Sequence, residues 1–303
     1  MSESVRQWKR RAQVIIGKGG SGLLVENLRV AFEVTKSAQA APNTAVIKIF
    51  NLAPANEARI KNEFDEVLLN AGYEGALRLV FRGNIKHVYR YRQRADIITE
   101  IEAGDGDRDF HQAVMNETLA AGTTNAQLAD RAVGSFPGGT IKGAVQLKDR
   151  PRLRGKVISR ATRDVLHDLA RESGANWSIQ DGQLVIVKTN DVLPGEAIVI
   201  NAETGMLGTP EVNDKGIAVK CLMNPQLRVN GAIQIDNNGI KAKRQRAKPL
   251  GDKKPQQGEP VRLDPDGIYK ILKLAHKGDT RGQDWVSEIE CIGLDQPIPK
   301  NRK

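Results

Sequence analysis

The chain has few cysteines, few aromatic residues and no long hydrophobic run. Cys221 and Cys291 are the only cysteines among its 303 residues, and both lie in apolar, strand-like segments. We therefore expect two buried, reduced thiols. A structural metal site needs several ligands at short spacing, and none accompany these cysteines.

A membrane helix would need about 18 consecutive apolar residues, so no membrane span is expected. The basic N-terminus lacks a following apolar stretch, so it is not expected to be a secretory signal.

The motifs of common enzyme sites are also missing. Residues 17–22 are glycine-rich, but a Walker loop needs Lys-Ser/Thr after its glycines, and here Lys18 precedes most of them. The four histidines do not have the i, i+4 spacing of a zinc protease. Glu100 and Glu102 share one face of a predicted strand, which leaves an acid pair open, although a charged sheet surface fits better. We predict that the protein is not an enzyme and uses no cofactor or metal.

Positive charge exceeds negative charge, giving a formal net charge of +10. The excess is concentrated at the two ends and in one internal run. That run consists of Lys241, Lys243, Arg244, Arg246 and Lys248, followed by Lys253 and Lys254. It lies in a long polar segment without apolar periodicity, so residues 237–260 are predicted to form a loop. The loop is interpreted either as a solvated tip or as an adaptable contact for an acidic partner. A nucleic-acid site over 241–254 is the alternative, although no aromatic residues interleave there to stack on bases.

Residues 1–105 read as mainly β. The segment 44–50 is rich in β-branched and aromatic residues and both of its faces are partly apolar, as expected for a covered strand. Pro54 suits the first turn of a helix over 54–62. Further strands are predicted from the alternation of apolar residues at 12–16, 23–26, 30–35, 67–71, 77–82, 85–91 and 97–103. Many short strands at near-regular spacing indicate a sandwich or a barrel.

The pattern changes near residue 106, where helical signals begin. Helices are predicted over 109–119, over 125–133 with Thr124 as the N-cap, and over 162–173 before Gly174. Asp181-Gly182 between two apolar runs predicts a hairpin over 177–187. The chain returns to β after this unit, with strands predicted over 217–222, 231–235, 267–275 and 285–292.

The order of these elements, together with local sequence, resembles the central baseplate hub proteins of bacteriophage tails, including tailocins and the spike hubs of type VI secretion. The matching residues lie at 43–54, 69–75, 80–84, 166–174, 177–187, 222–226 with Gly231, 267–270, 276–279 and Trp285. In this resemblance, Gly72, Tyr73, Gly75 and Gly83 look like hairpin and close-approach positions.

The resemblance implies a mainly β chain with an α+β insert. Residues 1–105 would form a first tail-tube-like β-barrel, 106–190 a small α+β domain, and 191–303 a second tail-tube-like β-barrel. Three chains would form a trimeric ring of six barrels that adapts a six-fold tail tube to a three-fold central spike. The implied partners are the homotrimer itself, the tail tube or distal tail protein, the spike and the baseplate wedge proteins. DNA would pass through the lumen without specific binding, and the protein would be made in the host cytoplasm and end in the virion.

Overall fold

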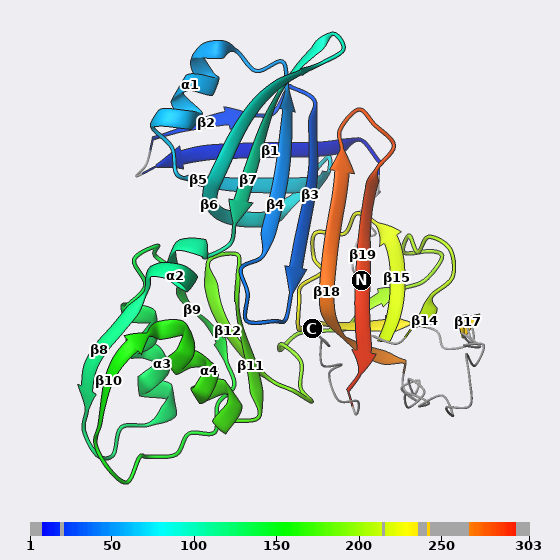
Figure 1. Ribbon diagram of the computed structural model, residues 1–303. Helices are drawn as coiled ribbons and strands as arrows, with labels where there is room; N and C mark the ends of the chain where they lie inside the picture. Colours follow the sequence, from blue (N-terminus) through cyan, green and yellow to red (C-terminus); the bar gives the residue numbers. More distant parts are fainter. Residues whose placement is uncertain (1–7, 19–20, 214–215, 236–240, 243–266, 295–303) are drawn as a thin grey trace, which may run out of the picture.

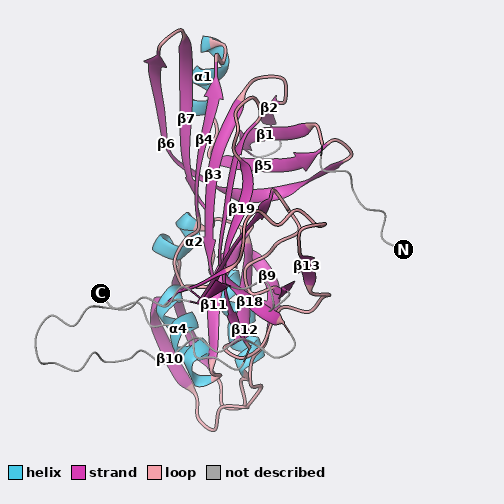
Figure 2. Ribbon diagram, turned by 90° about the vertical axis from the view of Figure 1, so that its right-hand side faces the viewer, coloured by secondary structure: helices cyan, strands magenta, loops and turns pink. Residues whose placement is uncertain are grey.

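The computed structural model describes residues 8–18, 21–213, 216–235, 241–242 and 267–294. The fold is mainly β, with 52% strand and 14% helix. Figures 1 and 2 show an elongated molecule in which a large sheet occupies the upper part and the right-hand side of Figure 1. The helices α2, α3 and α4 lie with short strands in a separate lower region.

The N-terminal region, residues 8–104, is built around antiparallel strands. Its elements are β1 (Arg10–Lys18), β2 (Ser21–Val25), β3 (Val30–Ser37), β4 (Thr44–Phe50), α1 (Pro54–Asn62), β5 (Glu66–Tyr73), β6 (Ala76–Gln93) and β7 (Asp96–Gly104). The predicted strands at 77–82 and 85–91 are one long strand, β6, because local register shifts let it bend while it stays paired. Gly83 lies where a Cβ would be 2.6 Å from the Gly104 carbonyl oxygen, so it is a close-approach position as predicted.

The middle region, residues 105–197, carries most of the helices. Its elements are α2 (Asp107–Gln112), β8 (Val114–Leu119), α3 (Asn125–Gly134), β9 (Ile141–Val145), β10 (Lys156–Ala161), α4 (Thr162–Glu172), β11 (Ala175–Gln180) and β12 (Gln183–Lys188). The predicted helix over 109–119 is wrong in its second half, because the chain leaves α2 at residue 112 and continues as β8. β8 pairs with β10, a partner some forty residues later that local periodicity does not reveal.

The C-terminal region is β again. Its elements are β13 (Ile198–Ile200), β14 (Glu211–Asn213), β15 (Gly216–Leu222), β16 (Ala232–Ile235), β17 (Lys241–Ala242), β18 (Ile268–Asp279) and β19 (Trp285–Gly293). The predicted strands of this region are confirmed to within a few residues, and β18 continues to Asp279, beyond the predicted end at residue 275.

A single sheet joins the two β regions. Its strand order is β17-β14-β15-β19-β18-β3-β4-β7-β6-β5-β1-β2, so β18 of the C-terminal region pairs directly with β3 of the N-terminal region. The predicted mainly β class is confirmed. Over the described residues this path of strands stays open at both ends and closes no barrel.

Each region has its own cluster of buried apolar side chains. The cluster of the N-terminal region also contains Met223 and Trp285, and Phe32 meets Trp285 edge-on with ring centroids 5.7 Å apart. The middle region packs α3 and α4 against its strands through residues such as Leu128, Leu166 and Trp177. The two β regions are therefore joined by packing as well as by strand pairing.

The helix ends follow the predicted local chemistry. Thr124 caps α3 in a capping box with Gln127, each side chain bonding to the other's backbone N–H. Gly174 follows α4 with φ 62°, the left-handed conformation typical of a helix C′ residue. Asp181 and Gly182 both have positive φ in the turn between β11 and β12, as a two-residue hairpin turn requires.

Candidate functional site

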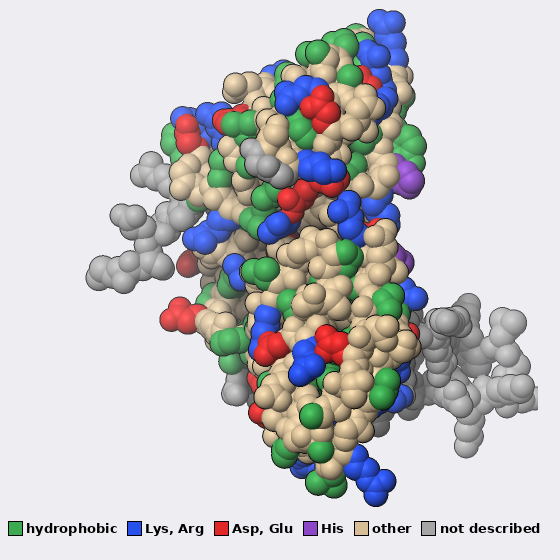
Figure 3. Space-filling model, turned by 90° about the vertical axis from the view of Figure 1, so that its left-hand side faces the viewer, with side chains coloured by type: hydrophobic (Ala, Val, Ile, Leu, Met, Phe, Trp, Pro, Cys, Tyr) green, Lys and Arg blue, Asp and Glu red, His purple; other side chains and the backbone are tan. Residues whose placement is uncertain are grey.

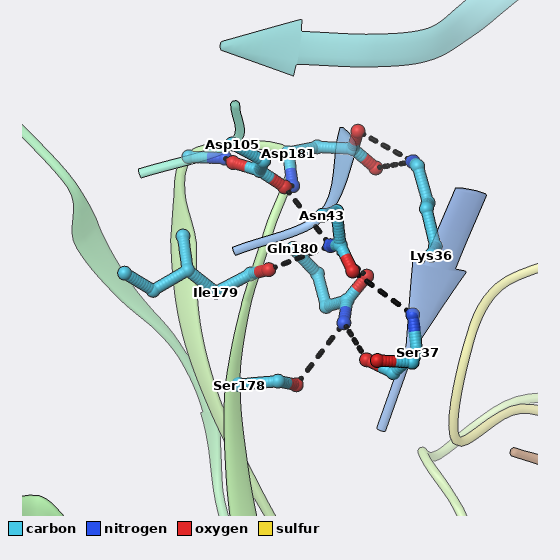
Figure 4. A network of polar contacts seen from close by, with 9 residues as sticks. Lys36, Ser37, Asn43, Asp105, Ser178, Ile179, Gln180 and Asp181 are labelled. Atoms are coloured by element: carbon cyan, nitrogen blue, oxygen red, sulfur yellow. Dashed lines mark hydrogen bonds and ion pairs between the residues drawn. The ribbon is translucent and has the colours of Figure 1, made fainter. Parts of the chain in front are cut away.

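The most elaborate polar site lies where the β11–β12 hairpin meets β3 and β4 (Figure 4). Asp105, directly after β7, is fully buried and its carboxylate accepts three hydrogen bonds. Oδ1 accepts from the backbone N–H of Gly182 at 2.9 Å, and Oδ2 accepts from that of Asp181 at 2.5 Å and from Asn43 Nδ2 at 3.3 Å. This carboxylate therefore fixes the turn of the hairpin against the end of the sheet.

Asn43 connects the same site to β3. Its Nδ2 donates to the Ile179 carbonyl at 2.9 Å and to Gln180 Oε1 at 3.0 Å, while its Oδ1 accepts from the backbone N–H of Ser37 at 2.9 Å. Gln180 Nε2 in turn donates to the Ser37 carbonyl at 2.8 Å. Side-chain amides thus satisfy backbone groups on both elements, which makes the contact specific in register.

Two buried lysines hold the β11–β12 hairpin at opposite ends. Lys36 of β3 is 5% exposed, and its Nζ lies 2.6 and 2.7 Å from the two carboxylate oxygens of Asp181 in the turn. Lys270 of β18 is completely buried and donates to the carbonyls of Lys188 at 2.9 Å and Thr189 at 3.3 Å, where β12 ends. Because β3 and β18 are the strands that join the two β regions, the middle region is anchored at their seam. We call the residues that make these contacts the polar junction: Lys36, Asn43, Asp105, Gln180, Asp181 and Lys270.

Burial shifts the proton affinities of the polar junction. It raises the pKa of Asp105 to about 6, with the nearby Asp181 adding to the rise and Lys36 and the two backbone N–H groups opposing it. Burial likewise lowers the pKa of Lys270 to about 8, partly offset by Asp191. Asp105 and Lys270 each bond to backbone groups at one end of the β11–β12 hairpin, so the polar junction is a structural connection between regions.

Part of the polar junction could be predicted from the sequence. The predicted change from strand to helix near residue 106 agrees with β7 ending at Gly104 and α2 beginning at Asp107. The part played by Asp105 and Asn43 was missed, because their partners lie more than sixty residues away. The visible clues were Asn43 at the head of the apolar strand 44–50 and Asp105 between two glycines.

The residues that the sequence offered as candidates for catalysis or metal binding form no reactive cluster in the described part of the chain. Glu100 accepts from the Tyr91 hydroxyl at 2.6 Å and pairs with Lys48 at 3.4 Å, so it belongs to a charged sheet face. Cys221 and Cys291 are free and buried as predicted, and burial raises the pKa of Cys221 to about 12. Among the described residues no group of three or more His, Cys, Asp or Glu side chains could hold a metal ion. No described helix is long and apolar enough to cross a membrane.

The basic run stays a prediction. Lys241 lies in β17, where its backbone pairs with Glu211 of β14. The other residues of the run lie outside the described part of the chain: Lys243, Arg244, Arg246, Lys248, Lys253 and Lys254.

One face of the large sheet carries a ladder of charges of both signs. Lys277 Nζ lies 3.6 Å from Glu33 and 3.0 Å from Glu288, and Lys220 lies 3.2 Å from Glu288. With the Lys48–Glu100 pair, this ladder crosses β7, β4, β3, β18, β19 and β15. The apolar clusters lie on the other side of these strands, so the ladder forms a hydrated face that alternates in charge.

The middle region shows a different surface. Figure 3 shows charged side chains gathered over the upper part of one face, whereas uncharged surface dominates the lower part, which the middle region forms. Among the exposed residues of β8 and β10 only Lys156 is charged, and Val114 and Val157 are well exposed there. The charge ladder and the mostly uncharged surface of the middle region therefore suit different partner surfaces.

Comparison with known families assigns this architecture. A family profile described as "Baseplate hub gp41" matches residues 11–238, about three quarters of the chain. The chain belongs to this baseplate hub family. The predicted resemblance to phage baseplate hubs is therefore confirmed, and the family places the protein in the tail of the virion as a structural component. Comparison with curated protein sequences gives no match.

Solved structures agree on the fold of this hub. The 43 kDa tail protein of prophage MuSo2 from Shewanella oneidensis is 12% identical, with a TM-score of 0.58 over 95% of this chain and 100% of that chain. A tail protein from Neisseria meningitidis MC58 is 8% identical, with a TM-score of 0.59 over 94% and 97%. The E. coli c3393 protein, described as a component of the type VI secretion system, is 11% identical, with a TM-score of 0.57 over 95% and 79%.

Proposed function

We propose that this baseplate hub acts as a homotrimer whose three chains form a ring of six tube-like β units around a lumen. Such a ring would present six similar units to the six-fold tail tube and three identical chains to the three-fold central spike. The observation that carries the proposal is the β3–β18 pairing, which sets two β regions of one chain side by side in one sheet. A closed ring then needs only the same kind of contact between chains.

The three regions correspond to three proposed domains. Residues 1–105 and 191–303 would be the two tail-tube-like units, with barrel closure completed in the assembled ring, and residues 106–190 would be the α+β domain between them. The separate apolar cluster of the middle region supports this division. The polar junction would hold the α+β domain at the seam, so that it projects from the ring in a fixed direction.

The edges of the large sheet support contacts between chains. Over the described residues the sheet ends at β2 on one side and at β17 on the other, and such edges readily pair with further strands. Leu24 of β2 is 52% exposed, so this edge also offers apolar surface. The tail tube or distal tail protein, the spike and the wedge proteins would contact the two rims and the periphery of the ring.

The charge ladder fits a surface past which DNA moves. DNA binds tightly where many cations neutralise its phosphates, and here each lysine has a carboxylate partner. A lumen lined by such a face would let DNA pass without retaining it. In this proposal the ladder faces the lumen.

The test is the mass of the protein in solution, measured by light scattering alone and with the spike protein. A trimer, or a monomer that becomes trimeric with the spike, is expected. Leu24→Lys should shift the equilibrium toward monomer by placing charge at the β2 edge, while Leu153→Lys, at a 95% exposed position in the loop before β10, is the matched control. A monomer under all conditions with salt-sensitive DNA binding would contradict the hub ring and favour the nucleic-acid alternative over residues 241–254.

A further inference from the structure

Three segments far apart in sequence meet at the edge where β1 begins. The start of β1, the turn between β2 and β3, and the turn between β18 and β19 enclose a surface notch of about 340 Å³. In Figure 1 the orange turn between β18 and β19 lies beside the beginning of the dark blue strand β1. The residues that line the notch include Lys9, Arg10, Arg11, Glu26, Asn27 and Arg281, and we call it the cationic notch.

The turn between β18 and β19 is held in one conformation beside the cationic notch. Arg29 binds both carboxylate oxygens of Asp279, Nε to Oδ1 at 3.1 Å and NH2 to Oδ2 at 2.6 Å. The backbone N–H of Arg281 donates to Asp279 Oδ1 at 2.9 Å, and Thr280 exchanges hydrogen bonds with Val30. The Asp279 carboxylate is thus occupied by Arg29 and by the backbone of its own turn.

Arg10 is held in place by uncharged groups. Its NH1 donates to the carbonyls of Gly282 at 2.8 Å and Gln283 at 3.3 Å, and its guanidinium lies over the buried Trp285 ring, 5.9 Å from the centroid. Arg281 NH2 donates to the Asn27 carbonyl at 3.5 Å. Within the described part of the chain, both guanidinium groups are therefore positioned by neutral carbonyl oxygens and not by carboxylates.

The positive charge of the cationic notch exceeds its negative charge. Lys9 and Arg11 share one carboxylate, Glu74, at 2.7 and 3.7 Å. Glu26 is the acidic residue among those that line the notch, and it accepts from Gln13 Nε2 at 3.2 Å. Preorganised guanidinium groups with unused donors are the usual receptors for carboxylates, which they bind through paired hydrogen bonds.

We propose that the cationic notch is a docking site for an acidic segment of a partner protein, with carboxylates bound by Arg10 and Arg281. The proposal goes beyond the ring and does not depend on it, because all three segments belong to one chain. A protein segment fits better than nucleic acid, because the notch is short and concave. Tracking a nucleic-acid strand calls for an extended basic groove, whereas the cationic notch is a compact site of about 340 Å³.

The experiment uses the full chain and a hexaglutamate peptide carrying a photoreactive group. Cross-linked residues are mapped by mass spectrometry, and the dissociation constant is measured by calorimetry at low salt. Cross-links are expected in residues 8–12, 26–28 and 280–283. Arg281→Gln should weaken binding about tenfold, since losing one charge-assisted contact at an interface typically has at least that effect.

Controls separate a specific site from general attraction to a basic protein. Arg154→Gln, an exposed arginine in the loop before β10, should leave both the affinity and the cross-links unchanged. Arg10→Gln is compared by its unfolding curve, because Arg10 also packs on Trp285, and Arg281→Gln carries the conclusion if Arg10→Gln is unstable. Cross-links confined to residues 241–254, equal weakening by Arg154→Gln, or displacement of the peptide by an equimolar DNA duplex would overturn the proposal.

Discussion

The two β regions and the middle region are attached to one another by different kinds of contact. β3 and β18 exchange backbone hydrogen bonds along Ala31–Ser37 and Lys273–Asp279, supported by packing of Phe32 on Trp285. The β11–β12 hairpin of the middle region is instead attached through the side chains of the polar junction. Backbone pairing tolerates most substitutions, whereas a buried side-chain network depends on each member. Single mutations should therefore weaken the attachment of the middle region much more than they weaken the β3–β18 pairing.

The strongest test of this difference is Asp105→Ala. The change leaves the backbone N–H groups of Asp181 and Gly182 and one Asn43 donor without their buried acceptor. We expect the free energy of unfolding to fall by about 3 kcal/mol, because an unsatisfied buried donor typically costs about 1–3 kcal/mol. Urea unfolding measures the change, with Asp164→Ala on the exposed face of α4 as the control. A loss no larger than that of the control would show that the network is dispensable.

Lys36→Met tests how much the Lys36–Asp181 ion pair contributes to the stability of the polar junction. The methionine keeps the apolar stem but leaves Asp181 without its 2.6 Å partner. A loss of about 2 kcal/mol is expected, below the full cost of breaking a buried pair because Asp181 is partly exposed. A double-mutant cycle with Asp181→Asn measures the coupling directly. Additive losses in that cycle would mean that the two side chains do not stabilise each other.

Acid titration tests the polar junction in the folded protein. A carboxyl whose pKa rises on folding binds its proton more tightly in the folded state. Since the pKa of Asp105 moves from 3.8 to about 6, its contribution to the free energy of unfolding should increase as pH falls from 6 to 4, by roughly 2 kcal/mol. Other carboxylates respond in the opposite sense, so the measured quantity is the difference between the wild type and Asp105→Asn. A difference that does not change with pH would contradict the buried, proton-binding role of Asp105.

The smallest effect is expected on the charge ladder. Lys277→Ala removes ion pairs to Glu33 and Glu288 on a hydrated sheet face. We expect a change of about 0.5 kcal/mol or less in the free energy of unfolding, as is usual for exposed pairs. Thermal unfolding at low and high salt measures it. A loss as large as that of Lys36→Met would remove the distinction between the ladder and the polar junction.

Much of the fold could be predicted because its signals are local. The capping box at Thr124, the apolar stripe of α4 and the Asp181-Gly182 turn each occupy a few consecutive residues and fix one conformation. Their predictions are confirmed. The resemblance to baseplate hubs rested on the order of such elements, and the family match confirms it.

The parts of the fold and site that could not be predicted depend on partners distant in the sequence. Val114–Leu119 became a strand because β10 pairs with it, and a stretch with several helix-compatible residues gives no sign of that partner. Asp105 and Asn43 look like ordinary turn residues until the β11–β12 hairpin is placed against them. The burial of Lys36 and Lys270 could not be predicted either, because lysine is rarely buried unless a partner accepts its hydrogen bonds, and these partners are distant in the sequence.

The seam between β3 and β18 has a mechanical consequence for a protein that sits in a tail. Antiparallel strands pulled apart along their length must break all of their cross-strand hydrogen bonds together, whereas strands peeled from one end lose them one after another. Along Lys273–Asp279 a load parallel to the strands would thus be shared across the whole overlap. The same sheet would yield far more readily to a force that opens it sideways. Resistance to tension in the hub therefore depends on the direction of these two strands relative to the tail axis.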